Sequence, residues 1–263
     1  MNEPNSQISS NLRTLIVGLA QGETADSYEA YKALYKIGPP AIQQIQEAVL
    51  QSNWSKVKYR EHIYYICGLI SLLHDIDEAE SKKLTAMIKN NGCDPSVARA
   101  LDSICRFTLK DYKQYNIHEV NIYEHKDLIT KQNVQQKIEK WLKNIPERDL
   151  RCIERIFVLR EGDIKALGTY TPYLYRINVV WSNPCSKWNP ISWLNSFIIE
   201  HTLYHEIGHH IYRHKFGQIS EQEDEAEKYA DMIFAEHSPR MVCKVGRTLA
   251  KLRRKFIPVR KSM

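Results

Sequence analysis

The chain has 263 residues, of which 43% are hydrophobic and 26% are charged, and its formal net charge at pH 7 is +6. These proportions are typical of a soluble globular protein and exclude a disordered chain, and the length allows one large domain or two modest ones. No apolar run is long enough to cross a bilayer, and the polar start MNEPNSQISSNLRT does not resemble a secretory signal peptide. The six cysteines are scattered without a Cys-x-x-Cys pair, which is typical of reduced thiols. We therefore expect a cytoplasmic protein.

The first half of the sequence predicts helices only. Asp26 and Glu29 resemble a capping box that opens DSYEAYKALYKI, and Gly38 ends that helix before PPAIQQIQEAVLQ begins another. Asp94 and Pro95 similarly predict the start of a later helix. The segment ALYKIGPPAIQQIQEAVL resembles a HEAT repeat, in which two apolar helices join through a tight turn. We therefore expect residues 1–115 to form an α-helical, HEAT-like interaction domain that binds a protein partner, with a plain helical bundle as the alternative.

Residues 111–130 are polar and weakly patterned, which predicts a domain boundary before a second domain over residues 131–263. That domain should begin with an amphipathic helix, NVQQKIEKWLKNI, followed by two segments rich in β-branched and aromatic residues, CIERIFVL and YLYRINVVW. One face of the second segment would carry alternate residues, Tyr173, Tyr175, Ile177, Val179 and Trp181. Gly168 and Pro172 limit the pairing of the connecting segment ALGTYTP. The predicted fold is therefore mainly α with a small β-sheet (α+β).

The stretch IIEHTLYHEIGHHIYRH, residues 198–214, holds five of the chain's ten histidines. Asn189 and Pro190 predict the start of a long helix there, and Gly217 predicts its end. His205 and His209 are one turn apart on such a helix, so their imidazoles can bind a single Zn²⁺. Glu206 lies on the adjoining face, where its carboxylate can reach the open coordination position of the metal.

A second helix follows within EQEDEAEKYADMIFAEH, opened by a predicted capping box of Ser220 and Glu223. Glu227 flanks its apolar stripe, 18 residues beyond His209 (227 − 209), and can be the third zinc ligand. Asp231, one turn further, can accept the second N–H of a ligand histidine. A site of two histidines and one glutamate leaves the fourth position for water, which is typical of catalytic zinc.

Two other glutamates are alternatives for the third ligand. Glu223 fits the capping role instead, and Glu225 lies two positions away from the register of Glu227 and Asp231. We therefore favour Glu227.

HEIGH followed by EKYADMIFA resembles the gluzincin clan of zinc metallopeptidases, whose pattern is HExxH followed by a helix with E-x-x-x-D. The sequence pattern E-x-x-A-D-x-x-F-A is similar to that of the CAAX-prenyl-protease and ImmA/IrrE-like branches of this clan. ALGTYTPYLYRINVVW is similar to the sheet segment before the active-site helix of ImmA/IrrE-like proteins, although those proteins usually have asparagine where Asp231 stands. The resemblance covers about residues 150–237. It implies a zincin-like domain with one Zn²⁺ per chain, held by His205, His209 and Glu227, and Glu206 as general base.

Peptide hydrolysis by this chemistry needs a second donor for the oxyanion. Tyr170, before the histidine helix, and His201, one turn before His205, are candidates for this role or for lining the cleft. The backbone of residues 168–170 can offer an edge to which a substrate strand adds. The neighbours His210 and His214 are expected to be solvated surface residues.

The segment after Glu236 contains no acidic side chain and predicts a basic amphipathic helix. We expect this helix to dock on the second domain. Contact with nucleic acid or an anionic membrane is the alternative.

The sequence as a whole predicts a zinc metallopeptidase that acts on a specific intracellular protein. Two alternatives remain open: a regulatory or binding module that keeps a zinc site with little turnover, and a DNA-associated regulator that cleaves a repressor. The presence of Glu206 argues against the pure binding module, because zinc retention alone does not need it.

Overall fold

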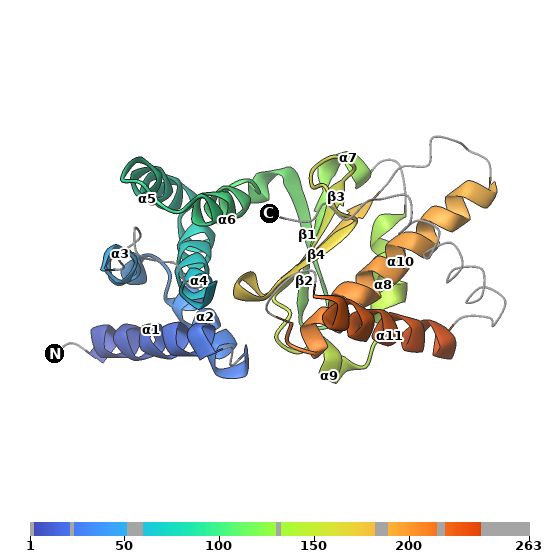
Figure 1. Cartoon of the computed structure of the whole chain (residues 1–263), viewed down its shortest axis with the longest axis horizontal. Coiled ribbons are helices and arrows are strands. Elements are labelled where there is room, and N and C mark those ends of the chain that lie inside the picture. The colour runs from blue at the N-terminus through green and yellow to red at the C-terminus, as the bar shows by residue number, and fades with distance from the viewer. Residues whose placement is uncertain are drawn as a thin grey trace. The chain divides into compact units, whose positions relative to one another are not determined.

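The computed structural model describes residues 3–21, 24–51, 60–129, 133–181, 189–214 and 219–237. This part of the chain is mainly helical with a small, mixed five-stranded sheet, so the α+β class is confirmed (Figure 1). The chain divides into two compact units, Met1–Tyr112 with Thr171–Tyr175, and Lys113–Tyr170 with Arg176–Met263. None of the helices that the structure describes is long and apolar enough to span a membrane. The predicted basic helix after Glu236 lies outside the described residues.

The first unit is built from helices whose ends follow local sequence signals. They are α1 (Glu3–Gln21), α2 (Thr24–Ile37), α3 (Ile42–Leu50), α4 (Arg60–Ile76), α5 (Glu78–Asn90) and α6 (Pro95–Cys105), with 3₁₀ turns η1 (Pro39–Ala41) and η2 (Leu109–Asp111). The predicted stop at Gly38 is confirmed, because this residue has a φ of 72°, which favours glycine. The predicted cap at Asp94 is also confirmed, since its side chain accepts the backbone N–H of Ser96. The capping box predicted at Asp26 is wrong, because α2 begins at Thr24. A HEAT-like character for these helices stays a prediction.

A short segment distant in sequence packs with these helices. After the 3₁₀ turn η3 (Pro172–Leu174), Tyr175 has a left-handed φ of 48°. Its hydroxyl donates a hydrogen bond of 2.8 Å to Ser27 Oγ, and its ring meets Tyr28 and Tyr31 edge-on at 5.3 and 5.4 Å. The prediction that Tyr173 and Tyr175 lie on a strand is therefore wrong, since that strand begins at Arg176.

The sheet belongs to the second unit and has the strand order β1-β2-β3-β5-β4. Its strands are β1 (Tyr112–Ile117), β2 (Val120–His125), β3 (Arg155–Arg160), β4 (Gly168–Thr171) and β5 (Arg176–Trp181), and β3 pairs in parallel with both β2 and β5. The division between the two units falls between Tyr112 and Lys113, inside the predicted boundary segment 111–130, but β1 and β2 occupy most of this segment and belong to the second unit. The exposed positions of β1 are polar, which is why its pattern looked weak in the sequence.

Helices cover one face of this sheet and form the main core of the unit. They are α8 (Val134–Leu142), α10 (Asn189–Ile211) and α11 (Ser220–His237), while α7 (Lys126–Ile129) and α9 (Glu147–Leu150) are short. Trp141 of α8 stacks on Trp181 of β5 with ring centroids 5.7 Å apart. The same core contains Ile156 and Ile177 from the central strands and Leu203 from α10. This core fixes α10 against the sheet.

Candidate metal centre

Helices α10 and α11 pack closely against each other (Figure 1). The close approach depends on Gly208, the glycine of HEIGH, because a Cβ there would lie 2.8 Å from the Cα of Ala226 and 2.9 Å from its carbonyl oxygen. Because Gly208 has no side chain and Ala226 opposite has a small one, the two backbones can approach closely. The motif therefore supplies the contact that brings the second helix to the histidines.

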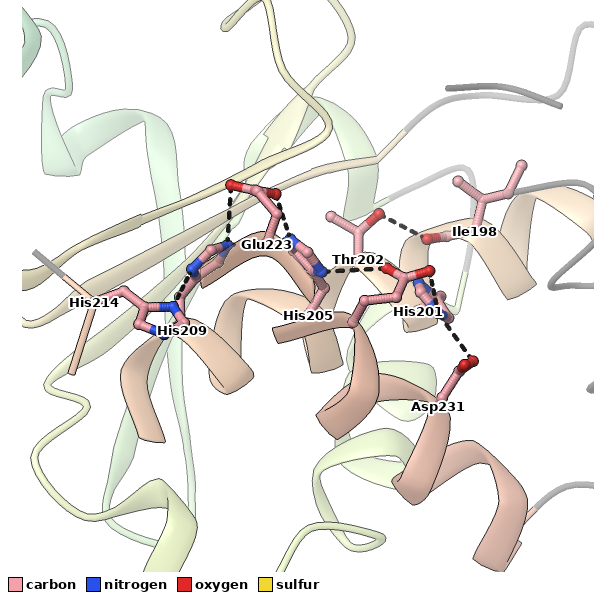
Figure 2. A network of polar contacts seen from close by, with 9 residues as sticks. Ile198, His201, Thr202, His205, His209, His214, Glu223 and Asp231 are labelled. Carbon is pink, nitrogen blue, oxygen red and sulfur yellow. Dashed lines mark hydrogen bonds and ion pairs between the residues drawn. The ribbon is translucent and has the colours of Figure 1, made fainter. Parts of the chain in front are cut away.

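Two rows of side chains face each other across this helix pair, as Figure 2 shows. Each row has a spacing of four residues, so each follows one face of its helix. The rows consist of His201, His205 and His209 on α10, and Glu223, Glu227 and Asp231 on α11. The result is a ladder of imidazoles opposite carboxylates.

One group in the ladder converges on a single point. The Nε2 atoms of His205 and His209 lie 3.1 Å apart, and the two carboxylate oxygens of Glu223 lie 3.3 and 3.6 Å from them, respectively. One ligand atom from each of the three residues lies within 4.8 Å of the others, so the group could hold a metal ion. Imidazole nitrogen and carboxylate oxygen are ligands that suit zinc.

Glu223 was expected to cap α11, and that interpretation is wrong. The helix begins at Ser220, and the backbone N–H of Glu223 donates to the carbonyl of Ile219. Ser220 is therefore inside the first turn, and the side chain of Glu223 reaches the two histidines.

Glu227 lies further along the ladder. Its Oε2 is 3.4 Å from Nδ1 of His205, and its Oε1 is 3.9 Å from Nε2 of His201. In this arrangement Glu227 can accept the second N–H of His205, the role predicted for Asp231, whereas Asp231 lies 3.9 Å from His201. The assignment of Glu227 as third ligand stays a prediction, with Glu223 as the alternative that the geometry offers.

His214 contacts Nδ1 of His209, the ring nitrogen that does not face His205. Helix α10 ends with Arg213 in a left-handed conformation, φ 54°, and the backbone N–H of His214 donates to the carbonyl of His209. This six-residue return is a Schellman motif. The predicted helix end at Gly217 is therefore wrong, and His214 turns back so that its Nδ1 lies 2.7 Å from Nδ1 of His209. The other nitrogen of His214 lies 2.9 Å from Glu225 Oε2.

His210 and His214 are only 6% and 7% exposed, so the expectation that they are solvated is wrong. Nε2 of His210 donates to the carbonyl of Arg151 at 2.7 Å, because a carbonyl can only accept. Its Nδ1 then accepts from the Tyr170 hydroxyl at 3.2 Å. Tyr170 would have to leave His210 to act as an oxyanion donor, so that role stays a prediction.

Glu206 is buried beside the convergent group, with 7% of its surface exposed. The edge strand β4 holds it: the backbone N–H of Tyr170 donates to its carboxylate, and a Cβ on Gly168 would lie 2.8 Å from its Oε1. Burial raises the pKa of Glu206 to about 7, and the nearby negative charge of Glu223 contributes in the same direction.

The two histidines of the group differ in charge. Burial acts to lower the pKa of His205, but the carboxylates of Glu223 and Glu227 outweigh it and raise the pKa to about 9. Burial and the charge on His205 together lower the pKa of His209. The proton on His205 thus balances the negative charge of these carboxylates, and a bound metal ion would replace this proton and balance the same charge. The donor set and its charge both fit a divalent metal ion.

Comparison of the chain with protein-family models, with curated proteins and with solved structures finds no match.

Proposed function

We propose that the protein is a zinc-dependent metallopeptidase that hydrolyses peptide bonds in a specific intracellular protein. The observation that carries this proposal is the convergence of His205, His209 and a glutamate carboxylate beside the buried Glu206. A metal-binding module alone has no need for a buried carboxylate next to its ligands.

The zinc ligands in this proposal are the Nε2 atoms of His205 and His209 and the carboxylate of Glu223, with Glu227 as the alternative. Three protein ligands leave a position open for water. When bound, zinc lowers the pKa of its water to near 7 and polarises a carbonyl oxygen.

Glu206 is the general base of the proposed reaction. Burial raises the pKa of Glu206 to about 7 in the metal-free protein, and the positive charge of bound zinc would lower it, so the group would be a carboxylate that can accept a proton near neutral pH. It takes a proton from the attacking water and delivers one to the leaving amine. The backbone N–H of Tyr170 and the close contact with Gly168 hold its carboxylate in one orientation.

The substrate in this proposal is an extended peptide segment that adds to β4. This strand stands at the end of the strand order, and its four residues are partly exposed. Because Gly168 of β4 contacts Glu206, a peptide paired with this strand would pass next to the general base. The same arrangement supports cleavage within a chain rather than at its end.

Two measurements test the proposal. The purified protein, reconstituted with zinc, should hold a tightly bound ion that the His209→Ala variant loses. Glu206→Gln should keep the ion but abolish cleavage, so this variant should trap intact substrates that the wild-type protein releases as fragments. Glu221→Gln, an exposed glutamate on α11, is the matched control and should cleave normally. Equal cleavage by Glu206→Gln and the wild-type protein would reject the mechanism.

A second candidate function is a zinc-holding regulatory module with little turnover. It is favoured by the position of Glu223, whose two carboxylate oxygens face the Nε2 atoms of His205 and His209. Two imidazoles and both oxygens of one carboxylate would fill four positions and leave none for water, which is typical of structural zinc. In that case the wild-type protein should hold zinc without cleaving, and Glu223→Gln should gain activity. The basic tail on which the DNA-associated alternative depends lies outside the described residues, so that alternative stays a prediction.

A further inference from the structure

We propose that the ladder holds a second divalent cation, bound by His201, Glu227 and Asp231, one helical turn from the first. This proposal rests on the proposed function in one respect: the first zinc ion is bound by His205, His209 and Glu223. It assigns every member of the two rows to one of two neighbouring sites.

The second group has the ligand types and spacing of a cation site. Nε2 of His201 lies 3.9 Å from Oε1 of Glu227 and 3.9 Å from Oδ1 of Asp231. Such distances are too long for hydrogen bonds. Two ligand atoms bound to one tetrahedral zinc at about 2.0–2.2 Å lie about 3.3–3.6 Å apart, so a small movement of each carboxylate towards His201 would let these atoms share an ion.

The ring of His201 is held in place by aromatic side chains. It stacks on Phe234 with centroids 5.6 Å apart and on Phe197 with centroids 6.3 Å apart, at 24° to each ring. These contacts leave only 13% of the His201 side chain exposed and keep its Nε2 towards the carboxylates (Figure 2). A fixed imidazole loses little conformational entropy when it binds an ion.

Glu227 connects the two sites through His205. Its Oε1 faces His201, and its Oε2 faces Nδ1 of His205. The Nε2 of His205 faces Glu223 in the first group. With Oε1 on the second ion, Oε2 can accept the N–H of His205 and orient that ring for the first ion. This division explains why Glu223, rather than Glu227, completes the first group.

The second site should bind more weakly than the first. Among the described residues, only His205, His209 and Glu223 form a group in which one ligand atom from each residue lies within 4.8 Å of the others. Asp231 and Glu227 must move towards His201 before both can contact one ion, and this movement reduces the affinity. We therefore expect one ion per chain to bind tightly and a second ion to bind more weakly.

Titration with Zn²⁺ alone tests the proposal. The full-length protein is stripped with a chelator, checked for retained helix content, and titrated by calorimetry, with metal analysis after dialysis. The wild-type protein should bind two ions per chain in two steps. His201→Ala and Asp231→Asn should lose the weaker step and keep the tighter one. Asp231→Asn is nearly isosteric, so it tests the site even if His201→Ala disturbs the core. His237→Ala, an exposed histidine beside Glu236, is the control and should bind two ions.

Each outcome has a distinct meaning. A single tight ion in the wild-type protein, unchanged in both variants, would overturn the second site and leave the proposed function standing. Two ions in the wild-type protein and in both variants would also overturn it, because the second ion would then bind elsewhere. Failure of the wild-type protein to bind any ion would reject the proposed function as well.

Discussion

The Nδ1 atoms of His209 and His214 lie 2.7 Å apart, and the far nitrogen of His214 lies 2.9 Å from the carboxylate of Glu225. If Nε2 of His214 donates to this carboxylate, its Nδ1 carries a lone pair and accepts the proton of His209. The Nε2 of His209 is then unprotonated and directed at the convergent group. His214 and Glu225 therefore fix the tautomer that a metal ligand needs.

Replacing His214 should weaken zinc binding without unfolding the protein. His214→Ala removes the acceptor for His209 Nδ1, and loss of such a partner typically costs about 10- to 100-fold in metal affinity. Competition with a chromophoric chelator measures this change. His237→Ala should retain wild-type affinity, whereas an unchanged affinity in His214→Ala would show that His209 needs no orienting partner.

Gly208→Ala should separate the two helices of the site. The new Cβ would lie 2.8 Å from the Cα of Ala226, and backbone atoms there cannot move aside independently. Overpacking of this kind costs about 1–3 kcal/mol of unfolding free energy. The unfolding free energy measured with denaturant and the zinc content should both fall, and both should fall further in Gly208→Ser than in Gly208→Ala. Normal zinc content in both variants would contradict the packing argument.

Gly168→Ala should reduce catalysis while zinc stays bound. Its Cβ would lie 2.8 Å from Cγ and Oε1 of Glu206 and 2.6 Å from Cγ2 of Thr202, so the general base must shift. We expect turnover to fall by at least about 10-fold, since misplacement of a catalytic group by 1 Å can cost about 100-fold. Thr202→Ser removes the Cγ2 methyl, and the double variant should recover part of the activity. Full activity in Gly168→Ala would exclude a role for Glu206 in its present position.

The two glutamates of α11 can be separated by amide substitution. Glu223→Gln should weaken the tight zinc equivalent, because Glu223 is the carboxylate nearest to both His205 and His209 Nε2 atoms. Glu227→Gln should mainly affect the weaker equivalent. Zinc titrations of both variants, with Glu221→Gln as control, measure the difference. If Glu227→Gln alone abolished tight binding, the assignment implied by the gluzincin resemblance would hold instead.

Glu124 on β2 should make the stability of the protein depend on pH. Its residue is 3% exposed, and burial raises the pKa of the carboxyl group against the lowering effects of Lys113 and Tyr115. A raised folded-state pKa stabilises the protein below the unfolded-state value, and this stabilisation is lost as the pH rises through the folded-state value. Glu124→Gln should therefore gain unfolding free energy relative to the wild-type protein between pH 4 and pH 8. Glu119→Gln, exposed in the turn of the same hairpin, should show no such trend, and parallel curves for Glu124→Gln and the wild-type protein would contradict the prediction.

Local sequence patterns predicted the parts of the site that depend on one helix. His205 and His209 lie together because their spacing matches one turn, and Glu206 adjoins them for the same reason. Which carboxylate of α11 faces the two histidines depends on the rotation of α11 about its axis and its distance from α10, and the contact between Gly208 and Ala226 sets both. That contact joins residues on different helices, so helix periodicity could not choose between Glu223 and Glu227.

Backbone contacts and polar residues in strands explain most of the remaining errors. His214 reaches His209 through a Schellman turn with arginine in the left-handed position, where glycine is the usual signal. The burial of His210 depends on the carbonyl of Arg151, a backbone group without a sequence signature. The strand β1 was missed because its exposed positions are polar, and β2 was missed because it carries the polar residues Glu124 and His125 at buried positions.

Metal content is the most direct test of the metallopeptidase proposal. The wild-type protein, stripped and reconstituted with Zn²⁺, is dialysed against buffer with a weak chelator, and its zinc is measured beside that of His205→Ala and His209→Ala. We expect one ion per chain that survives dialysis in the wild-type protein and is lost in both variants. A folded wild-type protein that retains no zinc, or variants that retain as much as the wild-type protein, would contradict it.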